Sequence, residues 1–287
     1  MSQMRFDGRT VLITGSTDGV GRRVAERLGA IGAHVLVHGR DKSRGKAVAE
    51  AVREAGGQAT FYQADLSALA EVRRLAGAVR QDHGRLDVLI NNAGLGSGAA
   101  RTRQTSVDGH ELLFAVNYLA GFLLTALLLP LLRVAAPARI VNVASAGQER
   151  IDFGDVMLTR NYSSGRAYRQ SKLAQILFTM DLAETLRGTG VTVTCLHPST
   201  FMDTTMVRQG GTTPVSTVDE GADAILKLAV SPEMKGRTGL YFNVLRETRA
   251  DAQAYDAEAR AKLRELSFRL SGAPEHSASR PARRDQA

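Results

Sequence analysis

A tyrosine and a lysine stand four residues apart in the segment Tyr168-Arg169-Gln170-Ser171-Lys172, near the start of a predicted helix from Gly165 to Leu186. Residues at positions i and i+4 share one face of a helix, so the phenol and the ammonium should be neighbours. A free phenol has a pKa of about 10 and is a weak acid–base catalyst at neutral pH. A cation beside it favours the phenolate, so this pair is a candidate for proton transfer with a lowered tyrosine pKa.

Other polar residues follow predicted strands. Ser145 comes after a predicted strand at Arg139–Val143, and Asn91-Asn92-Ala93-Gly94 follows one at Leu86–Ile90. In an open α/β sheet, ligands bind beyond the carboxyl ends of the strands. Each feature alone is compatible with a structural role, but together they predict a catalytic site at one edge of a sheet.

A glycine-rich turn, Thr14-Gly15-Ser16-Thr17-Asp18-Gly19-Val20-Gly21, joins a predicted strand at Thr10–Thr14 to a predicted helix at Val20–Ile31. The N–H groups and the dipole at a helix N-terminus both favour an anion. The spacing differs from Gly-x-Gly-x-x-Gly and from the Gly-Lys-Ser/Thr loop of nucleoside triphosphatases. A simple tight turn is the alternative, but the position after the first strand favours a phosphate-binding turn.

Arg40 follows the second predicted strand, Ala33–His38, at the place where a dinucleotide fold reads the adenosine ribose. An acidic side chain there would bind a free 2′-hydroxyl, whereas a guanidinium suits a 2′-phosphate. A solvated arginine at the end of a strand is the alternative. The residue type predicts NADP(H) rather than NAD(H).

In the N-terminal half of the chain, short apolar runs alternate with longer helical patterns, which is typical of βαβ units. We expect an α/β fold with a single doubly wound parallel sheet of about seven strands (a Rossmann fold) and helices on both faces, spanning residues 1–270. A tail at 271–287 is predicted to be disordered. The remaining predicted strands are Ala59–Gln63, Val191–Leu196 and a short edge strand at Leu240–Asn243, and the remaining predicted helices are Lys42–Ala55, Leu69–Gln81, Asp219–Leu228 and Arg249–Leu270.

Composition excludes several classes of protein. The net charge is +8, with 37 basic and 29 acidic residues, but the basic residues are scattered, so no nucleic-acid partner is expected. The single cysteine, Cys195, excludes an internal disulfide and a cysteine-rich metal site, and no metal is predicted. Residues 1–8 lack the apolar stretch of a signal peptide, and we expect a cytoplasmic protein.

The segment Phe114–Leu132 is uncharged and long enough to span a membrane. Asn117, Tyr118, Thr125 and Pro130 interrupt it, and it lies inside a regular alternation of strands and helices. A helix that is apolar all round can also be buried in a large core or a subunit interface. We therefore expect a buried helix and no membrane span.

These motifs together resemble the short-chain dehydrogenase/reductase family, and within it the retinol-dehydrogenase-like branch, from about Phe6 to Leu270. The matching residues are Thr14-Gly15-x-x-x-Gly19-x-Gly21, Asn91-Asn92-Ala93-Gly94, Asn117, Ser145, Tyr168-x-x-x-Lys172 and His197-Pro198. The branch is indicated by Ala167–Ala174 and by the long insert Gln148–Ser164 before it.

The resemblance implies a role for each matching side chain. Tyr168 would donate a proton in reduction and accept one in oxidation, and Ser145 would hydrogen-bond the substrate oxygen. Lys172 would hold the nicotinamide ribose and lower the pKa of Tyr168. Asn117 would kink its helix and carry a water that relays protons to Lys172. Asp65 and Leu66 would flank the adenine. The full predicted cofactor-binding set is Gly15, Ser16, Asp18, Gly19, Val20, Gly21, Arg40, Asp65, Leu66, Asn92, Ala93, Gly94, Tyr168, Lys172, Pro198 and Thr200.

Two positions depart from the family pattern. The usual Pro-Gly after the sixth strand is Pro198-Ser199 here, and the threonine that would meet the nicotinamide amide falls one residue late, at Thr204. Asp18 stands where some NADP-dependent members have a basic residue, so the choice of cofactor rests on Arg40.

Two segments are expected to cover the substrate, Gln148–Ser164 and Ser199–Thr213. Their Phe and Met side chains suit a bulky apolar carbonyl compound, although they could equally pack the loops onto the fold. We expect an NADP(H)-dependent reductase for a hydrophobic ketone or aldehyde. Oxidation of a secondary alcohol with NADP⁺ and a catalytically silent NADP(H)-binding sensor or scaffold remain alternatives. The intact Ser145, Tyr168 and Lys172 favour an enzyme, and the resemblance suggests a homodimer.

Overall fold

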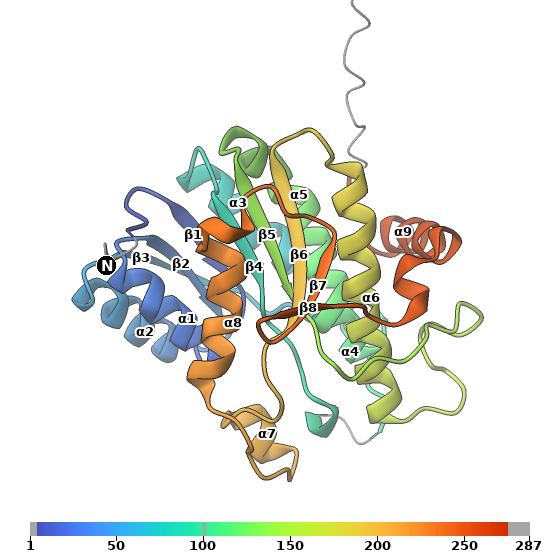
Figure 1. The fold of residues 1–287 in the computed structure, drawn as a ribbon. Coiled ribbons are helices and arrows are strands. Elements are labelled where there is room, and N and C mark those ends of the chain that lie inside the picture. Colours follow the sequence, from blue (N-terminus) through green and yellow to red (C-terminus); the bar gives the residue numbers. More distant parts are fainter. Residues whose placement is uncertain (1–4, 100–101, 275–287) are drawn as a thin grey trace, which may run out of the picture.

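One eight-stranded sheet forms the centre of the molecule in a computed structural model that describes residues 5–99 and 102–274 (Figure 1). The strand order is β3-β2-β1-β4-β5-β6-β7-β8, and neighbouring strands are parallel except β7 and β8. The strands are β1 Thr10–Ile13, β2 His34–Gly39, β3 Gln58–Gln63, β4 Val88–Asn91, β5 Ala138–Val143, β6 Val191–His197, β7 Leu240–Asn243 and β8 Arg246–Thr248. The order reverses between β1 and β4, which is where doubly wound sheets bind ligands.

The predicted doubly wound fold is confirmed, with one strand more than expected. The sequence places Leu240–Asn243 at the edge of the sheet, but β8 pairs antiparallel beyond it, with Tyr241 opposite Thr248. The three residues of β8 are all exposed. A strand without buried side chains leaves no hydrophobic pattern in the sequence, which is why it was missed.

Helices cover both faces of the sheet. Figure 1 shows α1, α2 and α8 on the near face and α3 and α5 on the far face. In β1, Val11 and Ile13 pack in the first of these layers and Leu12 in the second, as expected for a strand buried on both sides. The helices are α1 Gly19–Ala30, α2 Lys42–Glu54, α3 Leu69–Asp82, α5 Ala120–Val134, α6 Ser164–Thr185 and α8 Val218–Val230.

The long apolar helix runs from Leu112 to Val134 as α4 (Leu112–Phe114), a π-helical turn η2 (Ala115–Leu119) and α5. It is long and apolar enough to cross a membrane, with a mean hydropathy of 2.2, but 78% of that apolar window is buried inside the fold. A core helix of a soluble protein passes the same test of length and composition.

Helix α9 (Ala257–Ser271) packs on α6 and also contacts this apolar helix. The ring of Phe268 packs edge-on against Phe122 with 5.2 Å between centroids, and the hydroxyls of Tyr118 and Ser267 are hydrogen-bonded at 2.6 Å. Figure 1 shows α9 on the outer side of α6. The apolar helix is therefore a core element in this structure.

The C-terminal part differs from the predicted single helix Arg249–Leu270. The short helix η4 (Ala252–Tyr255) comes first, and Asp256 then caps α9 by accepting from the amides of Glu258 and Ala259. Ser271, which the predicted disordered tail includes, is the buried last residue of α9, and the Gly272 carbonyl accepts from Arg73 at 3.0 Å. Residues 275–287 lie outside the described part of the chain.

Candidate active site

The glycine turn and the turn after β4 are hydrogen-bonded to each other at the switch point of the sheet. Thr14 Oγ1 accepts from the amides of Asn92 and Ala93, both at 3.0 Å. The Asn92 side-chain amide donates to the carbonyls of Thr14 and Gly15, at 2.9 and 3.1 Å. The two predicted motifs thus form one unit at the carboxyl ends of β1 and β4.

The glycines are required by this close approach. A Cβ on Gly15 would lie 2.8 Å from the Cα of Ala93, and one on Gly21 would lie 2.3 Å from the carbonyl oxygen of Gly15. Gly15 also has a φ of 63°, which favours glycine. The tight-turn explanation is therefore correct, and it is compatible with phosphate binding, because the amides of Val20 and Gly21 at the start of α1 have no acceptor within the helix.

Two residues of the predicted cofactor-binding set use their side chains elsewhere. The hydroxyl of Ser16 is fully buried, donates to the carbonyl of Ile13 at 2.9 Å and accepts from the amide of His38 at 3.0 Å. The Asp18 carboxylate caps α1 by accepting from the amide of Gly19 at 2.7 Å, and it lies 3.6 Å from the Arg44 guanidinium. The negative charge at Asp18 is thus accompanied by a cation.

The adenosine end of the predicted site lies beyond β2 and β3. The Arg40 side chain is exposed and forms no ion pair with any residue in the ranges 5–99 and 102–274. Asp65 closes the turn after β3 by accepting from the amide of Ser67 at 2.9 Å. The Leu66 side chain is buried in the core beneath α3. Arg40 therefore has a free guanidinium for an anionic ligand.

Tyr168 and Ser145 meet at the carboxyl end of β5. The Ser145 side chain lies close enough to the phenol of Tyr168 to favour its ionised form. Ser145 is held in turn by the Gly147 amide, which donates to its Oγ at 3.1 Å, and by the Tyr241 hydroxyl, which donates to its carbonyl at 3.1 Å. Two hydroxyl groups are therefore presented together at one fixed point.

Lys172 lies beneath the ring of Tyr168, as the predicted helix spacing requires. Its Nζ is 5.8 Å from the ring centroid and donates to the carbonyl of Val143 at 2.9 Å and to Gln175 Oε1 at 3.0 Å. Both partners are neutral. Burial without a carboxylate partner lowers the pKa of Lys172 to about 7.

The pKa of Tyr168 moves opposite to the sequence-based expectation. Burial of the phenol raises its pKa, and the nearby Ser145 side chain offsets only part of that increase. Lys172 points its ammonium at Val143 and Gln175 rather than at the phenol oxygen. The phenol is thus held protonated at neutral pH, which is the form that donates a proton to a carbonyl.

Asn117 lies in the π-helical turn η2, where the predicted kink takes the form of a local widening of the helix. Its side chain accepts from the Leu95 amide at 2.6 Å and donates to the Leu95 carbonyl at 3.1 Å and to Ser171 Oγ at 3.0 Å. A Cβ on Gly94 would lie 3.2 Å from Asn117 Oδ1 and 3.5 Å from Lys172 Nζ. Gly94 therefore brings the backbone after β4 close to both Asn117 and Lys172.

The segment after β6 brings another group close to the lysine. His197 is buried, and burial together with the charge of Lys172 lowers its pKa. Its Nε2 lies 3.0 Å from the hydroxyl of Thr200. Thr200 and the buried Pro198, both in the predicted cofactor-binding set, thus follow the strand end next to Lys172.

Thr204 lies at the same edge of the sheet but has a structural partner. Its hydroxyl caps the short helix α7 (Thr205–Gln209) by accepting from the Val207 amide at 3.3 Å. Its methyl group packs against Gly19, within 3.2 Å of where a Cβ on that glycine would be. A nicotinamide contact by Thr204 remains a prediction.

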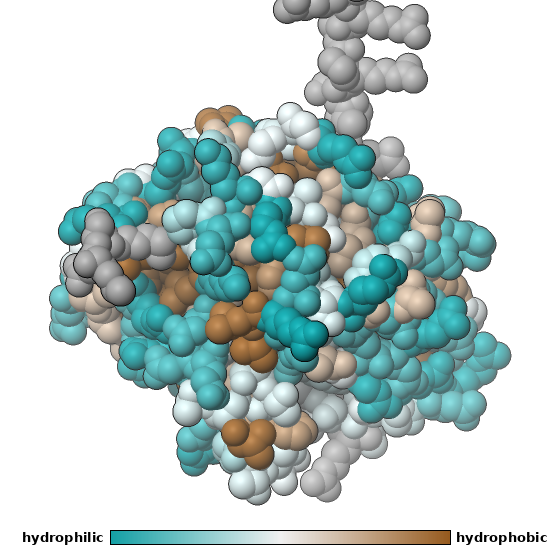
Figure 2. All heavy atoms as spheres, viewed as in Figure 1, coloured by the Kyte–Doolittle hydropathy of each residue, from teal (hydrophilic) through white to brown (hydrophobic). Residues whose placement is uncertain are grey.

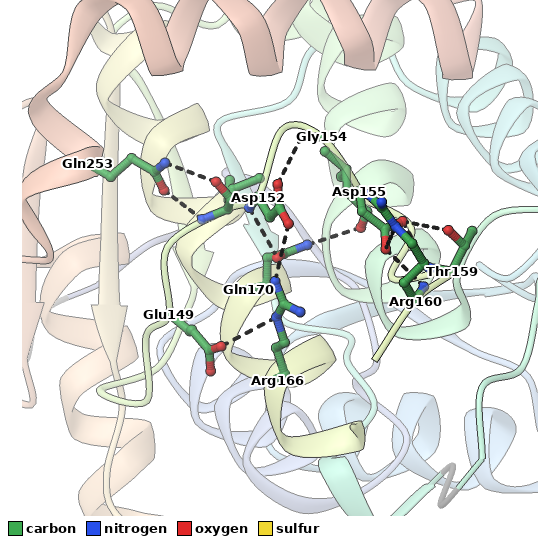
Figure 3. Close-up of polar contacts among 11 residues, drawn as sticks. Glu149, Asp152, Gly154, Asp155, Thr159, Arg160, Arg166, Gln170 and Gln253 are labelled. Atoms are coloured by element: carbon green, nitrogen blue, oxygen red, sulfur yellow. Dashed lines mark hydrogen bonds and ion pairs between the residues drawn. The ribbon is translucent and has the colours of Figure 1, made fainter. Parts of the chain in front are cut away.

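The insert Gln148–Ser164 is anchored to the rest of the fold by side-chain hydrogen bonds (Figure 3). Gln170, on α6, donates to the Val156 carbonyl at 3.0 Å and accepts from the Asp152 amide at 3.4 Å. Gln253, on η4, accepts from the Ile151 amide at 2.7 Å and donates to the Ile151 carbonyl at 3.1 Å.

The tip of the insert is closed by Asp155. Its carboxylate accepts from the amides of Thr159 and Arg160 at 2.8 and 2.9 Å, and these bonds lower its pKa to about 2. The turn holds Leu158 at a φ of 47° and buries its side chain next to Ala167 and the ring of Tyr168. The insert therefore builds a fixed apolar wall beside the phenol.

The segment around α7 is different, because its apolar side chains face solvent. Phe201, Met206 and Val215 are 51%, 43% and 69% exposed. Figure 2 shows apolar surface at the position of α7, beyond the end of the sheet. Met206 also reaches back toward Gly96, within 2.9 Å of where a Cβ on that glycine would be. These side chains are therefore free to contact an apolar ligand.

Sequence reasoning missed the residues that fix the site rather than form it. Gln170, Gln253, His38 and Tyr241 each reach the site through a contact with a residue distant in sequence or on another element. No local sequence pattern indicates such a contact, because these residue types also occur on protein surfaces without a structural role.

Replacing Gln170 with alanine should lower the free energy of unfolding by about 2 kcal/mol, because the Asp152 amide and the Val156 carbonyl lose their buried partner. In a chain of this size the melting temperature should fall by roughly 4–8 °C. Gln81→Ala, at an exposed position of α3, is the matched control and should change little. Equal melting temperatures for the two variants would show that Gln170 does not anchor the insert.

Comparison with known proteins agrees with this arrangement. The family model of the short chain dehydrogenases matches residues 9–214. Mouse retinol dehydrogenase 14 is 37% identical over 91% of this chain and 85% of its own. A solved structure of an uncharacterised protein from Mycobacterium paratuberculosis superposes with a TM-score of 0.78 at 32% identity, covering 94% of this chain and 97% of its own. The Pseudomonas aeruginosa RhlG/NADP active-site complex superposes with a TM-score of 0.69 at 30% identity, covering 85% and 97%.

Proposed function

The chain belongs to the short-chain dehydrogenase family and is retinol-dehydrogenase-like, and from this premise we propose that it is an NADP(H)-dependent carbonyl reductase. Its proposed substrate is a hydrophobic ketone or aldehyde, or the corresponding alcohol in the reverse direction. The observation that carries the proposal is the meeting of Tyr168, Ser145 and Lys172 at the carboxyl end of β5. A family member without catalytic activity would have no need to hold all three.

In reduction, the substrate carbonyl oxygen lies against the hydroxyls of Ser145 and Tyr168. Ser145 donates a hydrogen bond that stabilises the negative charge developing on that oxygen. Tyr168 transfers its proton to the oxygen, and its raised pKa keeps that proton available at neutral pH. The nicotinamide, when bound, supplies the hydride. Lys172 binds the ribose beside Gly94 and keeps the nicotinamide end of the cofactor in place.

NADP(H) is proposed as the cofactor on the chemistry of three places. The amides at the start of α1 suit the pyrophosphate, the free guanidinium of Arg40 suits a 2′-phosphate, and the ammonium of Lys172 beside Gly94 suits the hydroxyls of the nicotinamide ribose. A related protein was solved as an NADP complex, which supports the same choice here.

Replacing Arg40 with glutamine should weaken NADPH binding by about 10- to 100-fold and leave NADH binding within about twofold. The reason is that a charge-assisted hydrogen bond to the 2′-phosphate contributes about 1.5–3 kcal/mol and NADH lacks that phosphate. Titration calorimetry with both cofactors measures the ratio. Arg80→Gln, at an exposed position of α3, is the matched control. If the two cofactors lose affinity equally, Arg40 does not read the 2′-phosphate.

The apolar surroundings of Tyr168 support a hydrophobic substrate. Leu113, Leu158 and Ala167 pack beside its ring, and relatives of this chain are named as retinol dehydrogenases, whose named substrate is a largely hydrocarbon alcohol. The direct test is purified protein with NADPH and a panel of aromatic and terpenoid ketones and aldehydes. Oxidation of NADPH by one of them is expected. Tight NADPH binding with no turnover of any compound would instead favour a sensor or scaffold.

We also propose that the protein is cytoplasmic, with its apolar helix retained in the fold and no nucleic acid bound. Support for the retained helix comes from the burial of most of its apolar window inside the fold. Cell fractionation tests it, and protein that stays in the membrane pellet after an alkaline wash would contradict it.

A further inference from the structure

The buried His38 side chain is used by none of the steps above, yet it touches the glycine turn directly. It lies at the end of β2, is only 2% exposed, and its Nδ1 accepts from the amide of Gly15 at 3.1 Å. Two backbone contacts strengthen the same junction: the His38 amide donates to Ser16 Oγ at 3.0 Å, and the Ser16 amide donates to the His38 carbonyl at 2.9 Å. Three hydrogen bonds therefore tie β2 to the turn.

Gly15 is thus held from both sides. Its amide is bonded to His38, and its carbonyl accepts from the Asn92 side chain at 3.1 Å. The same carbonyl lies within 2.3 Å of where a Cβ on Gly21 would be, so it packs directly against the first turn of α1. A rotation of the Gly15 peptide would move the amides that are expected to bind the pyrophosphate.

The protonation of His38 fits this contact. Burial lowers its pKa to about 4, so the ring is neutral under ordinary conditions. Because Nδ1 accepts a hydrogen bond, the proton of the neutral ring must be on Nε2. Nε2 is sealed from solvent and forms no hydrogen bond of normal geometry within residues 5–99 and 102–274, although the Ala64 carbonyl lies on its side of the ring.

A buried N–H donor without a partner, such as Nε2 of His38, lowers the free energy of unfolding, and an aliphatic side chain at position 38 would not carry this penalty. The hydrogen bond from Gly15 to Nδ1 offsets the penalty. We propose that His38 is a positioning residue for the cofactor, which holds Gly15 in the orientation that places the amides at the start of α1 for the pyrophosphate. This proposal rests on the NADP(H) dependence proposed above. It concerns a side chain that never touches the cofactor itself.

The experiment measures the affinity of His38→Leu for two ligands, NADPH and adenosine 2′-monophosphate, which lacks the pyrophosphate. NADPH should bind about tenfold more weakly, as expected for the loss of one buried hydrogen bond. Adenosine 2′-monophosphate should bind as to the wild type, because its phosphate faces Arg40 rather than the glycine turn. His38→Asn should restore NADPH binding, since Asn Oδ1 can take the place of Nδ1.

His34→Leu is the matched control, because His34 lies on the same strand and contacts Thr60 Oγ1 far from the turn. NADPH affinity of His38→Leu within twofold of the wild type would overturn the proposal, and so would an equal loss for both ligands. If His38→Leu does not fold, NADPH affinity is compared between His38→Asn and His38→Gln instead. His38→Asn should bind NADPH more tightly, and equal affinities would contradict the positioning role of His38. Wild-type protein that binds no NADPH would overturn the proposed function itself.

Discussion

Tyr168→Phe should reduce the rate of ketone reduction by about 100-fold or more while NADPH affinity stays within about twofold of the wild type. The variant keeps the ring that packs against Leu158 and Ala167 and removes only the hydroxyl beside Ser145. The substrate oxygen then loses its proton donor but the cofactor keeps its contacts. Steady-state rates with a ketone found in the substrate panel, together with calorimetric titration of NADPH, measure both quantities.

Tyr255→Phe is the control for a general effect of removing a tyrosine hydroxyl, because the Tyr255 hydroxyl, on η4, accepts from the Ala250 amide. Its rate should remain close to that of the wild type. If Tyr168→Phe retains more than a tenth of the wild-type rate, the proton comes from another group and the proposed mechanism is wrong.

The part of this site that could be predicted from sequence is the part that lies at strand ends. Continuous apolar runs such as those of β1 and β4 mark strands buried on both faces, and their carboxyl ends must share one edge of the sheet. Gly15, Asn92 and Ser145 follow such strands directly, so their convergence could be inferred without coordinates. The i, i+4 spacing of Tyr168 and Lys172 likewise defines a shared face once a helix is assumed.

Features that depend on tertiary burial could not be predicted in the same way. The sequence shows a cation near a phenol and so suggests a lowered tyrosine pKa. The structure shows that Lys172 turns its ammonium to Val143 and Gln175, so burial dominates and raises the pKa of Tyr168. The direction of a pKa shift depends on which of the two effects is larger, and only the packing decides that.

Short or exposed helices and strands could not be predicted from hydrophobic periodicity either. β8 has three exposed residues and α7 has five, none of them buried, so neither leaves a hydrophobic pattern. The anchoring of the insert by Gln170 and Gln253 depends on single side chains that bridge distant segments. These residues nevertheless shape the wall beside Tyr168, so the sequence predicts the chemistry better than the shape of the substrate pocket.

Lys172→Met should abolish most of the activity and also stabilise the protein near neutral pH. The lysine is fully buried with neutral partners, and burial lowers its pKa to about 7, below the value of about 10.4 in an unfolded chain. Between these two values the unfolded chain binds more protons than the folded one. The free energy of unfolding of the wild type therefore rises with pH in this range, by up to about 1.4 kcal/mol per unit.

The methionine variant lacks this contribution, so its advantage over the wild type should be largest at pH 6–7 and should shrink steadily toward pH 10. Urea unfolding of both proteins at several pH values measures the difference, in which all other titrating groups cancel. Lys235→Met, at an exposed position, should show no such trend. A constant difference across this range would mean that Lys172 remains charged in the folded protein. Its ammonium would then have to be stabilised by the Val143 carbonyl and Gln175 alone.

The expected loss of activity is tested by steady-state rates. Because methionine cannot bind the ribose, the rate should fall at least about 100-fold even where the variant is the more stable protein.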